Sequence, residues 1–136
     1  MTRQTILVTG ASSGFGAAIV RRFVSDSHRV VAAARRAPGL EALASELGDQ
    51  VHPLMLDVRD SVAVEAAIRT LPETFEQIDV VINNAGLARG LEPAHRADVD
   101  DWDVMIDTNC KGLVYCTRAV LPGMVARGRG HVVNIG

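Results

Sequence analysis

Residues 5–16 read TILVTGASSGFG, and this stretch decides the fold. Its first residues are aliphatic or β-branched on both faces, as in a strand buried within a parallel sheet. Gly10, Gly14 and Gly16 follow, and residues 14–25 then carry apolar side chains at helical spacing. A buried strand, a glycine-rich turn and an amphipathic helix predict the opening unit of an α/β domain.

The same alternation continues to residue 136. Short β-branched runs predict strands at residues 5–8, 29–33, 51–56, 78–82 and 131–135. Helical periodicity predicts helices at residues 14–25, about 40–47, about 60–71 and about 98–126, with Pro122 bending or restarting the last one. Right-handed crossovers then give an α/β fold with a doubly wound parallel sheet of strand order 3-2-1-4-5.

The glycine turn indicates a phosphate site. Glycine lets the backbone approach a pyrophosphate without an intervening Cβ, and free N–H groups at a helix start stabilise the anion. A P-loop is excluded because no lysine lies near the turn. We therefore expect a single dinucleotide-binding domain of the Rossmann type over residues 1–136. The alternative is that any strand-to-helix turn favours glycine. The expected contacts in the turn are Gly10, Ser12, Ser13, Gly14, Phe15 and Gly16.

The end of the second predicted strand favours NADP over NAD. Residues 32–36 read AAARR and contain no carboxylate. A carboxylate near this point bonds the ribose 2′-hydroxyl of NAD, whereas a guanidinium grips the 2′-phosphate of NADP. We expect Arg35 and Arg36 to hold that phosphate, although both could instead begin a solvated loop.

Composition and charge exclude several other classes. The formal net charge of -2 provides no field to hold nucleic acid, so a small-molecule substrate is expected. Cys110 and Cys116 have neither metal nor redox spacing, and the four histidines are scattered, so no metal site is expected. No apolar stretch approaches the length of a membrane span, and we expect a cytoplasmic protein without membrane contact.

Three motifs together carry a family resemblance. They are Thr9-Gly10-x-x-x-Gly14-x-Gly16, Asn83-Asn84-Ala85-Gly86 after the fourth predicted strand, and Asn109-x-x-Gly112 in the last predicted helix. This set resembles the signature of the short-chain dehydrogenase/reductase family and extends over the whole sequence. The resemblance implies an NADP-dependent oxidoreductase.

The resemblance also implies roles for individual residues. Asp57 would accept from the adenine amino group, and Val58 would flank the adenine. Asn83, Ala85 and Gly86 would line the ribose and nicotinamide side. Asn109 would be catalytic, by keeping a water in the proton path. Lys111 and Tyr115 stand in the reverse order from the family's Tyr-x-x-x-Lys, so we expect them at an interface or on the surface.

A narrower resemblance concerns residues 83–95 and 101–124, which are similar to bacterial NADP-dependent 3-hydroxy acid dehydrogenases. It implies hydride transfer between NADP(H) and a small 3-hydroxy acid or a related alcohol or carbonyl compound. It also implies a homotetramer or homodimer built through the long helix.

By the same resemblance, the catalytic Ser is expected just after Gly136 and the Tyr-x-x-x-Lys farther on. We expect these 136 residues to lack the family's C-terminal strands, to be inactive alone, and to aggregate or need a partner at the last strand. Two alternatives stay open. One is a non-catalytic NADP-binding module, and the other is a different enzyme of the family, an isomerase or dehydratase.

Overall fold

Five strands form one parallel sheet in the computed structural model, which describes residues 2–136. The order β3-β2-β1-β4-β5 confirms the predicted topology. Every neighbouring pair is parallel. The strands are β1 (Thr5–Thr9), β2 (Arg29–Ala34), β3 (Val51–Met55), β4 (Val80–Asn83) and β5 (His131–Asn134).

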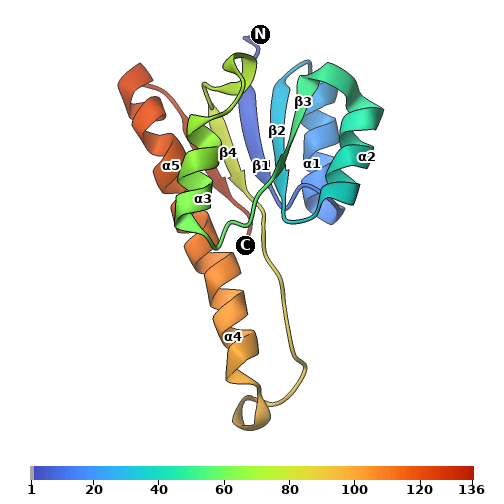
Figure 1. The fold of residues 1–136 in the computed structure, drawn as a ribbon, viewed down its shortest axis with the longest axis vertical. Coiled ribbons are helices and arrows are strands. Elements are labelled where there is room, and N and C mark those ends of the chain that lie inside the picture. The colour runs from blue at the N-terminus through green and yellow to red at the C-terminus, as the bar shows by residue number, and fades with distance from the viewer. Residues whose placement is uncertain (1) are drawn as a thin grey trace.

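Helices cover both faces of the sheet (Figure 1). On one face lie α1 (Gly14–Ser25) and α2 (Ala37–Leu47), and on the other α3 (Ser61–Arg69) and α5 (Gly112–Arg127). The helix α4 (Val99–Ile106) extends beyond the sheet toward the carboxyl ends of the strands. Short helical turns complete the chain: η1 (Gly48–Gln50), η2 (Glu73–Phe75), η3 (Ala94–Arg96) and η4 (Asp107–Lys111).

The strand β1 lies at the centre of the core, and all five of its residues are buried. Leu7 packs into the apolar cluster under α3 and α5, whereas Ile6 and Val8 pack into the cluster under α1 and α2. A strand covered on both faces needs apolar side chains in both directions, which explains the apolar run Ile6-Leu7-Val8 at its centre.

The last predicted helix is wrong as a single element. The structure divides residues 98–126 into α4, the π-helical segment η4 and α5. A π turn takes up one extra residue without ending the helix, so the apolar periodicity does not reveal it. The predicted restart at Pro122 is also wrong, since α5 continues through it to Arg127 and ends at Gly128 in the left-handed conformation (φ 70°).

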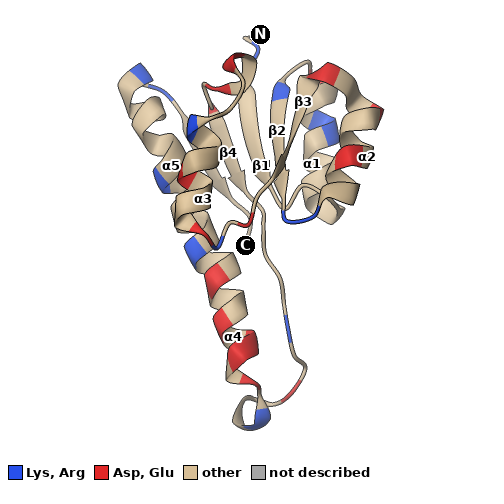
Figure 2. Cartoon of the chain, in the orientation of Figure 1, with Lys and Arg blue, Asp and Glu red and all other residues tan. Residues whose placement is uncertain are grey.

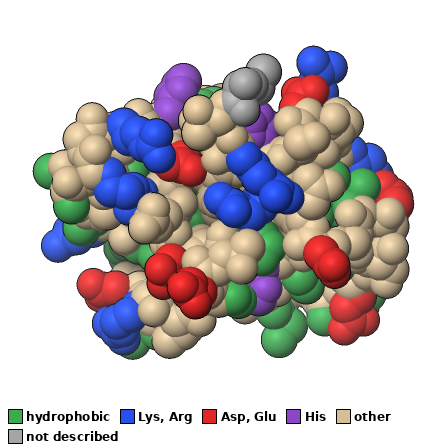
Figure 3. Space-filling model, turned by 90° about the horizontal axis from the view of Figure 1, so that it is seen from above, with side chains coloured by type: hydrophobic (Ala, Val, Ile, Leu, Met, Phe, Trp, Pro, Cys, Tyr) green, Lys and Arg blue, Asp and Glu red, His purple; other side chains and the backbone are tan. Residues whose placement is uncertain are grey.

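Charged side chains are distributed unevenly over the fold. Acidic residues lie along α4, beginning with its N-cap residue Asp98 (Figure 2). At the amino ends of the strands, basic and acidic side chains are interspersed (Figure 3). There the carboxylate of Asp79 accepts from the Thr5 N–H at 2.9 Å and lies 3.6 Å from the Arg129 guanidinium. Within residues 2–136, no helix has the length and apolar character needed to cross a membrane.

Candidate functional site

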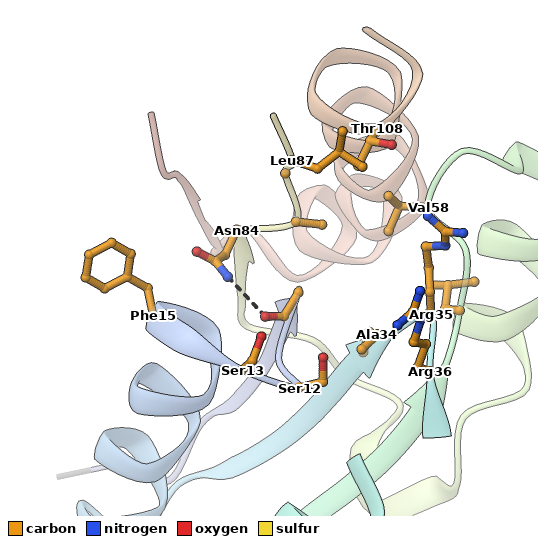
Figure 4. A pocket seen from close by; sticks show the side chains of 15 residues that line it. Ser12, Ser13, Phe15, Ala34, Arg35, Arg36, Val58, Asn84, Leu87 and Thr108 are labelled. Carbon is orange, nitrogen blue, oxygen red and sulfur yellow. Dashed lines mark hydrogen bonds between the residues drawn. The ribbon is translucent and has the colours of Figure 1, made fainter. Parts of the chain in front are cut away.

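A cavity of about 460 Å³ opens at the carboxyl ends of the central strands (Figure 4). It lies between the ends of β1 and β4, where the chain runs from β1 to β2 on one side and from β4 to β5 on the other. This is the switch point at which open α/β sheets bind ligands. Its lining residues are Gly10, Ser12, Ser13, Phe15, Ala33, Ala34, Arg35, Arg36, Leu56, Val58, Asn84, Ala85, Gly86, Leu87 and Thr108.

The floor of the cavity is the glycine turn. Gly10 adopts φ +62°, and a Cβ added there would lie 2.9 Å from the Cα of Ala85. A Cβ at Gly16 would overlap the carbonyl oxygen of Gly10. At Gly14, by contrast, an added Cβ meets nothing within 4 Å. Glycine at positions 10 and 16 therefore permits close packing of the backbone, and glycine at position 14 accommodates a left-handed backbone conformation with φ +57°.

The start of α1 can receive an anion. Ser13 is the N-cap residue, its side chain makes no capping hydrogen bond, and the first turn of α1 contains no acidic residue. Backbone N–H groups at a helix start lack intrahelical partners and carry partial positive charge. Ser13 lies at the cavity beside this helix start (Figure 4), so both the amides and the hydroxyl can face a phosphate.

Asn84 joins the two turns that flank the cavity. Its Nδ2 donates to the carbonyl oxygens of Thr9 and Gly10, each at 3.2 Å. Figure 4 marks the bond to Gly10. In return, Thr9 Oγ1 accepts from the backbone N–H of Asn84 at 3.0 Å and of Ala85 at 2.9 Å. These four bonds fix the turn after β4 against the glycine turn. Asn84 belongs to the Asn83-Asn84-Ala85-Gly86 motif but was not among the expected site residues.

One end of the cavity is positively charged. Arg35 and Arg36 directly follow the buried Ala34 at the end of β2, and both are exposed at the cavity. They lie beside Ser12, at the end away from Phe15 (Figure 4). No carboxylate is found among the described residues that line the cavity. This end therefore suits a phosphate dianion.

Val58 lines the cavity, but Asp57 does not. The Asp57 carboxylate is bound bidentately by Arg59, with Nε 3.0 Å from Oδ1 and Nη2 2.7 Å from Oδ2. These side-chain hydrogen bonds hold the pKa of Asp57 below its usual value. An arginine two residues after the acid is the only sign of this pairing in the sequence, and the adenine contact of Asp57 stays a prediction.

The structure does not bring Asn83 into the cavity. Asn83 is buried, and its Nδ2 donates to Thr117 Oγ1 at 3.0 Å and to Asn134 Oδ1 at 2.9 Å. Successive residues of a strand face opposite sides of the sheet, so Asn83 points toward α5 while its neighbour Asn84 reaches the glycine turn. Asn83 thus supports the sheet beneath the site rather than lining it.

Asn109 lies in η4 and binds the segment that follows β4. Its Oδ1 accepts from the Leu87 N–H at 2.8 Å, and its Nδ2 donates to the Leu87 carbonyl at 2.9 Å. Both ends of the amide are therefore used to hold Leu87 at the cavity wall. Its place in a proton path stays a prediction, although π segments often occur at functional sites.

Lys111 and Tyr115 lie outside the cavity lining. Lys111 Nζ is 3.0 Å from Asp107 Oδ1, and this bond raises the pKa of Lys111. Tyr115 is half-buried against the cluster under α3 and α5. The described contacts agree with a surface and packing role for the pair.

The comparison with protein families decides the affiliation. The model described as short chain dehydrogenase matches residues 4–136. The chain belongs to the short-chain dehydrogenase family. This membership agrees with the glycine turn, the strand order and the cavity at the switch point.

Similar proteins include dehydrogenases named for 3-hydroxy acids and for serine. The chain is 59% identical to "NADP-dependent 3-hydroxy acid dehydrogenase YdfG" of Salmonella typhi over 131 residues, 96% of this chain and 53% of that protein. It is 47% identical to "Serine 3-dehydrogenase" of Agrobacterium fabrum, over 96% of this chain and 52% of that protein. The chain thus spans about half the length of the curated relatives it matches.

Two solved structures have the same fold over nearly the whole of this chain. The closed form of serine dehydrogenase complexed with NADP+ is 55% identical, with a TM-score of 0.96 over 98% of this chain and 54% of that chain. Serine dehydrogenase from Escherichia coli gives a TM-score of 0.94 at 55% identity, over 98% of this chain and 61% of that chain.

Proposed function

We propose that this chain binds NADP in the cavity, within an oxidoreductase that transfers hydride between NADP(H) and a small 3-hydroxy acid or a related alcohol or carbonyl compound. The observation that carries the proposal is the arginine pair beside the glycine turn, in a cavity without a lining carboxylate. The names of the similar proteins support both the cofactor and the substrate class.

The residues present fit such a dinucleotide. The uncapped start of α1 would hold the pyrophosphate, and Ser12, Arg35 and Arg36 would hold the 2′-phosphate. Val58 and Leu87 offer apolar walls for the adenine, and the nicotinamide end would extend toward Phe15 and Asn84. NAD would leave both guanidinium groups without a phosphate partner. When bound, the nicotinamide supplies the hydride acceptor or donor.

The cofactor preference is tested by binding. NADPH fluorescence titrations should show tight binding by the parent protein and much weaker binding of NADH. Replacing Arg35 and Arg36 by Ala should weaken NADPH binding about 10- to 100-fold, because a hydrogen-bonded charge pair is lost. NADH binding should change little. Arg21→Ala is the matched control, since Arg21 lies on α1 and pairs with Glu46. Equal losses for both cofactors would refute a 2′-phosphate role.

The substrate class is tested by turnover. A longer protein that carries this chain together with the expected Ser and Tyr-x-x-x-Lys should reduce NADP+ with serine or 3-hydroxypropionate as the alcohol and should be slow with NAD+, whereas residues 1–136 alone should show no turnover. A rate with simple alcohols but none with 3-hydroxy acids would remove the substrate proposal and leave the cofactor proposal intact.

The same proposal includes association into a homodimer or homotetramer and a cytoplasmic location. Exposed apolar side chains on α4 and α5, among them Trp102, Ile106 and Val125, support association through these helices. Cys110 and Cys116 are both free thiols, as expected in a reducing compartment. Light scattering behind a sizing column tests the first point, and fractionation of cells tests the second.

A further inference from the structure

A second cavity lies at the opposite edge of the sheet from the glycine turn, where the strands begin. Its volume is about 370 Å³, and three arginines line it: Arg3, Arg29 and Arg129. Arg3 precedes β1, Arg29 is the first residue of β2, and Arg129 precedes β5. Figure 3 looks onto this edge, and basic side chains gather near its middle. The parallel sheet thus brings guanidinium groups from three separate parts of the sequence to one cavity.

The guanidinium group of Arg29 is oriented by the protein itself. Thr5, which is 1% exposed, pairs with Arg29 in the register of β1 and β2, and its Oγ1 accepts from Arg29 Nε at 3.1 Å. Within residues 2–136, the two terminal nitrogens of Arg29 have no hydrogen-bond or ion-pair partner, and neither has the guanidinium group of Arg3. A guanidinium held through Nε presents its remaining N–H groups in the geometry that binds a carboxylate or phosphate bidentately.

Two carboxylates line the same cavity and compensate the arginines only in part. Asp79 is already engaged, because it accepts from the Thr5 N–H at 2.9 Å and lies 3.6 Å from Arg129 Nη2. Glu73 is exposed and has no ion-pair partner in the part of the chain that the structure describes. The cavity therefore keeps a surplus of one positive charge. Guanidinium groups gathered without partners repel one another, and an anion between them would turn this repulsion into attraction.

We propose that this cavity binds a small oxyanion, the carboxylate or phosphate group of a metabolite, held by Arg3 and Arg29 with Arg129 beside them. The surplus of one positive charge suits a ligand with one or two negative charges. Thr74 and Gln77 also line the cavity and offer uncharged hydrogen-bonding groups to the rest of the ligand. The inference is independent of the proposed function, because none of these residues lines the cavity at the glycine turn.

Calorimetric titrations with inorganic phosphate and with succinate, at constant ionic strength, test the site in the full protein that carries this chain. At least one of the two anions should bind saturably, with a Kd of about 1 mM. Arg29→Gln should weaken this binding about tenfold or more, and Arg3→Gln about three- to tenfold, because charge-assisted hydrogen bonds are lost. Binding of phosphate alone would identify a phosphate ligand, and binding of succinate alone a carboxylate ligand.

Two control variants separate this cavity from other places where anions bind. Arg21→Gln removes the same charge from α1, where Arg21 pairs with Glu46, and should leave the binding unchanged. The double variant Arg35→Ala/Arg36→Ala removes the positive end of the cavity at the glycine turn. It should leave the binding that depends on Arg29 intact.

Thermal unfolding provides the second measurement. The bound anion should raise the Tm of the parent, and this increase should be lost in Arg29→Gln. If Arg29→Gln does not fold, Arg3→Gln decides the question, since Arg3 is exposed and lies outside the strands.

Three results would overturn the inference. The first is that neither anion binds with a Kd below about 10 mM. The second is that binding is lost in Arg35→Ala/Arg36→Ala and kept in Arg29→Gln and Arg3→Gln, which would place the anion in the other cavity. The third is that Arg21→Gln weakens binding as much as Arg29→Gln, which would show only a general effect of charge. None of the three would bear on NADP binding, which the titrations with NADPH test separately.

Discussion

The centre of the sheet and its β5 edge differ in how completely their residues are buried. Around the glycine turn, every residue of β1 is buried, and β2 is buried from Val30 to Ala34. At the edge of the sheet, by contrast, no residue of β5 is fully buried. Large apolar side chains are exposed on the helices of that side: Val99, Trp102, Ile106, Val114, Leu121 and Val125. The central strands β1 and β2 are thus held by packing on both faces, whereas the surface of α4 and α5 leaves apolar side chains for contact with other groups.

The largest expected effect on stability is at the glycine turn. In Gly16→Ala the new methyl would overlap the carbonyl of Gly10, so the free energy of unfolding should fall by about 3 kcal/mol or more. Gly14→Ala is the matched control, with no steric contact and only the strain of φ +57°, about 1–2 kcal/mol. Chemical denaturation measures both. Equal losses would mean that packing at the turn is not what requires glycine at position 16.

The next prediction compares a valine-to-alanine substitution at a buried position of β2 with one at an exposed position of α5. Val31→Ala removes two methyl groups from a fully buried position and should cost about 2 kcal/mol. Val125, which is 75% exposed, should tolerate Ala within about 0.5 kcal/mol. Denaturation at several protein concentrations is the measurement. A comparable loss at Val125 would show that its face is buried against another chain in solution.

A smaller effect on stability concerns the hydrogen bonds between η4 and the segment that follows β4. Asn109→Ala removes both hydrogen bonds to Leu87 and should cost about 1–2 kcal/mol, with faster hydrogen exchange at the Leu87 amide. Cys110→Ala, an exposed neighbour in η4, should change neither. Unaltered exchange at Leu87 in Asn109→Ala would mean that the amide does not hold this segment.

The smallest effect is electrostatic and depends on pH. The hydrogen bonds from Arg59 lower the pKa of Asp57, so their contribution is present above the unfolded-state pKa near 3.8. It is lost as the pH falls through the lower folded-state value. Arg59→Gln should therefore be less stable than the parent at neutral pH, and the difference should vanish in acid. A difference that stays constant down to pH 2 would contradict the pairing.

Much of the fold follows from local patterns. Strands buried on both faces, right-handed crossovers and a glycine turn between Thr9 and Ala17 together determine the strand order and the position of the cavity. The arginines after β2 could be predicted because they lie about 20 residues past the glycines, at the end of the second predicted strand, where a dinucleotide fold contacts the ribose.

The remaining features depend on where each strand or helix begins and ends to within one residue, which a single sequence does not determine. Whether Asn83 or Asn84 faces the cavity depends on which residue ends β4, and a shift of one position reverses the answer. The π segment adds one residue to a helix whose apolar spacing looks continuous. Thr108 lines the cavity without belonging to the expected site residues, because a single threonine on a helix forms no recognisable pattern.

The π segment η4 also has a geometric consequence for α4. Each residue of an α-helix advances the chain by about 100° around the axis, so one surplus residue changes the angular phase between the two helices that it joins. Deleting one residue within 107–111 would rotate α4 by about that angle while α5 stays seated on the sheet. Trp102 would then face a new direction, although no side chain of α4 itself had been altered.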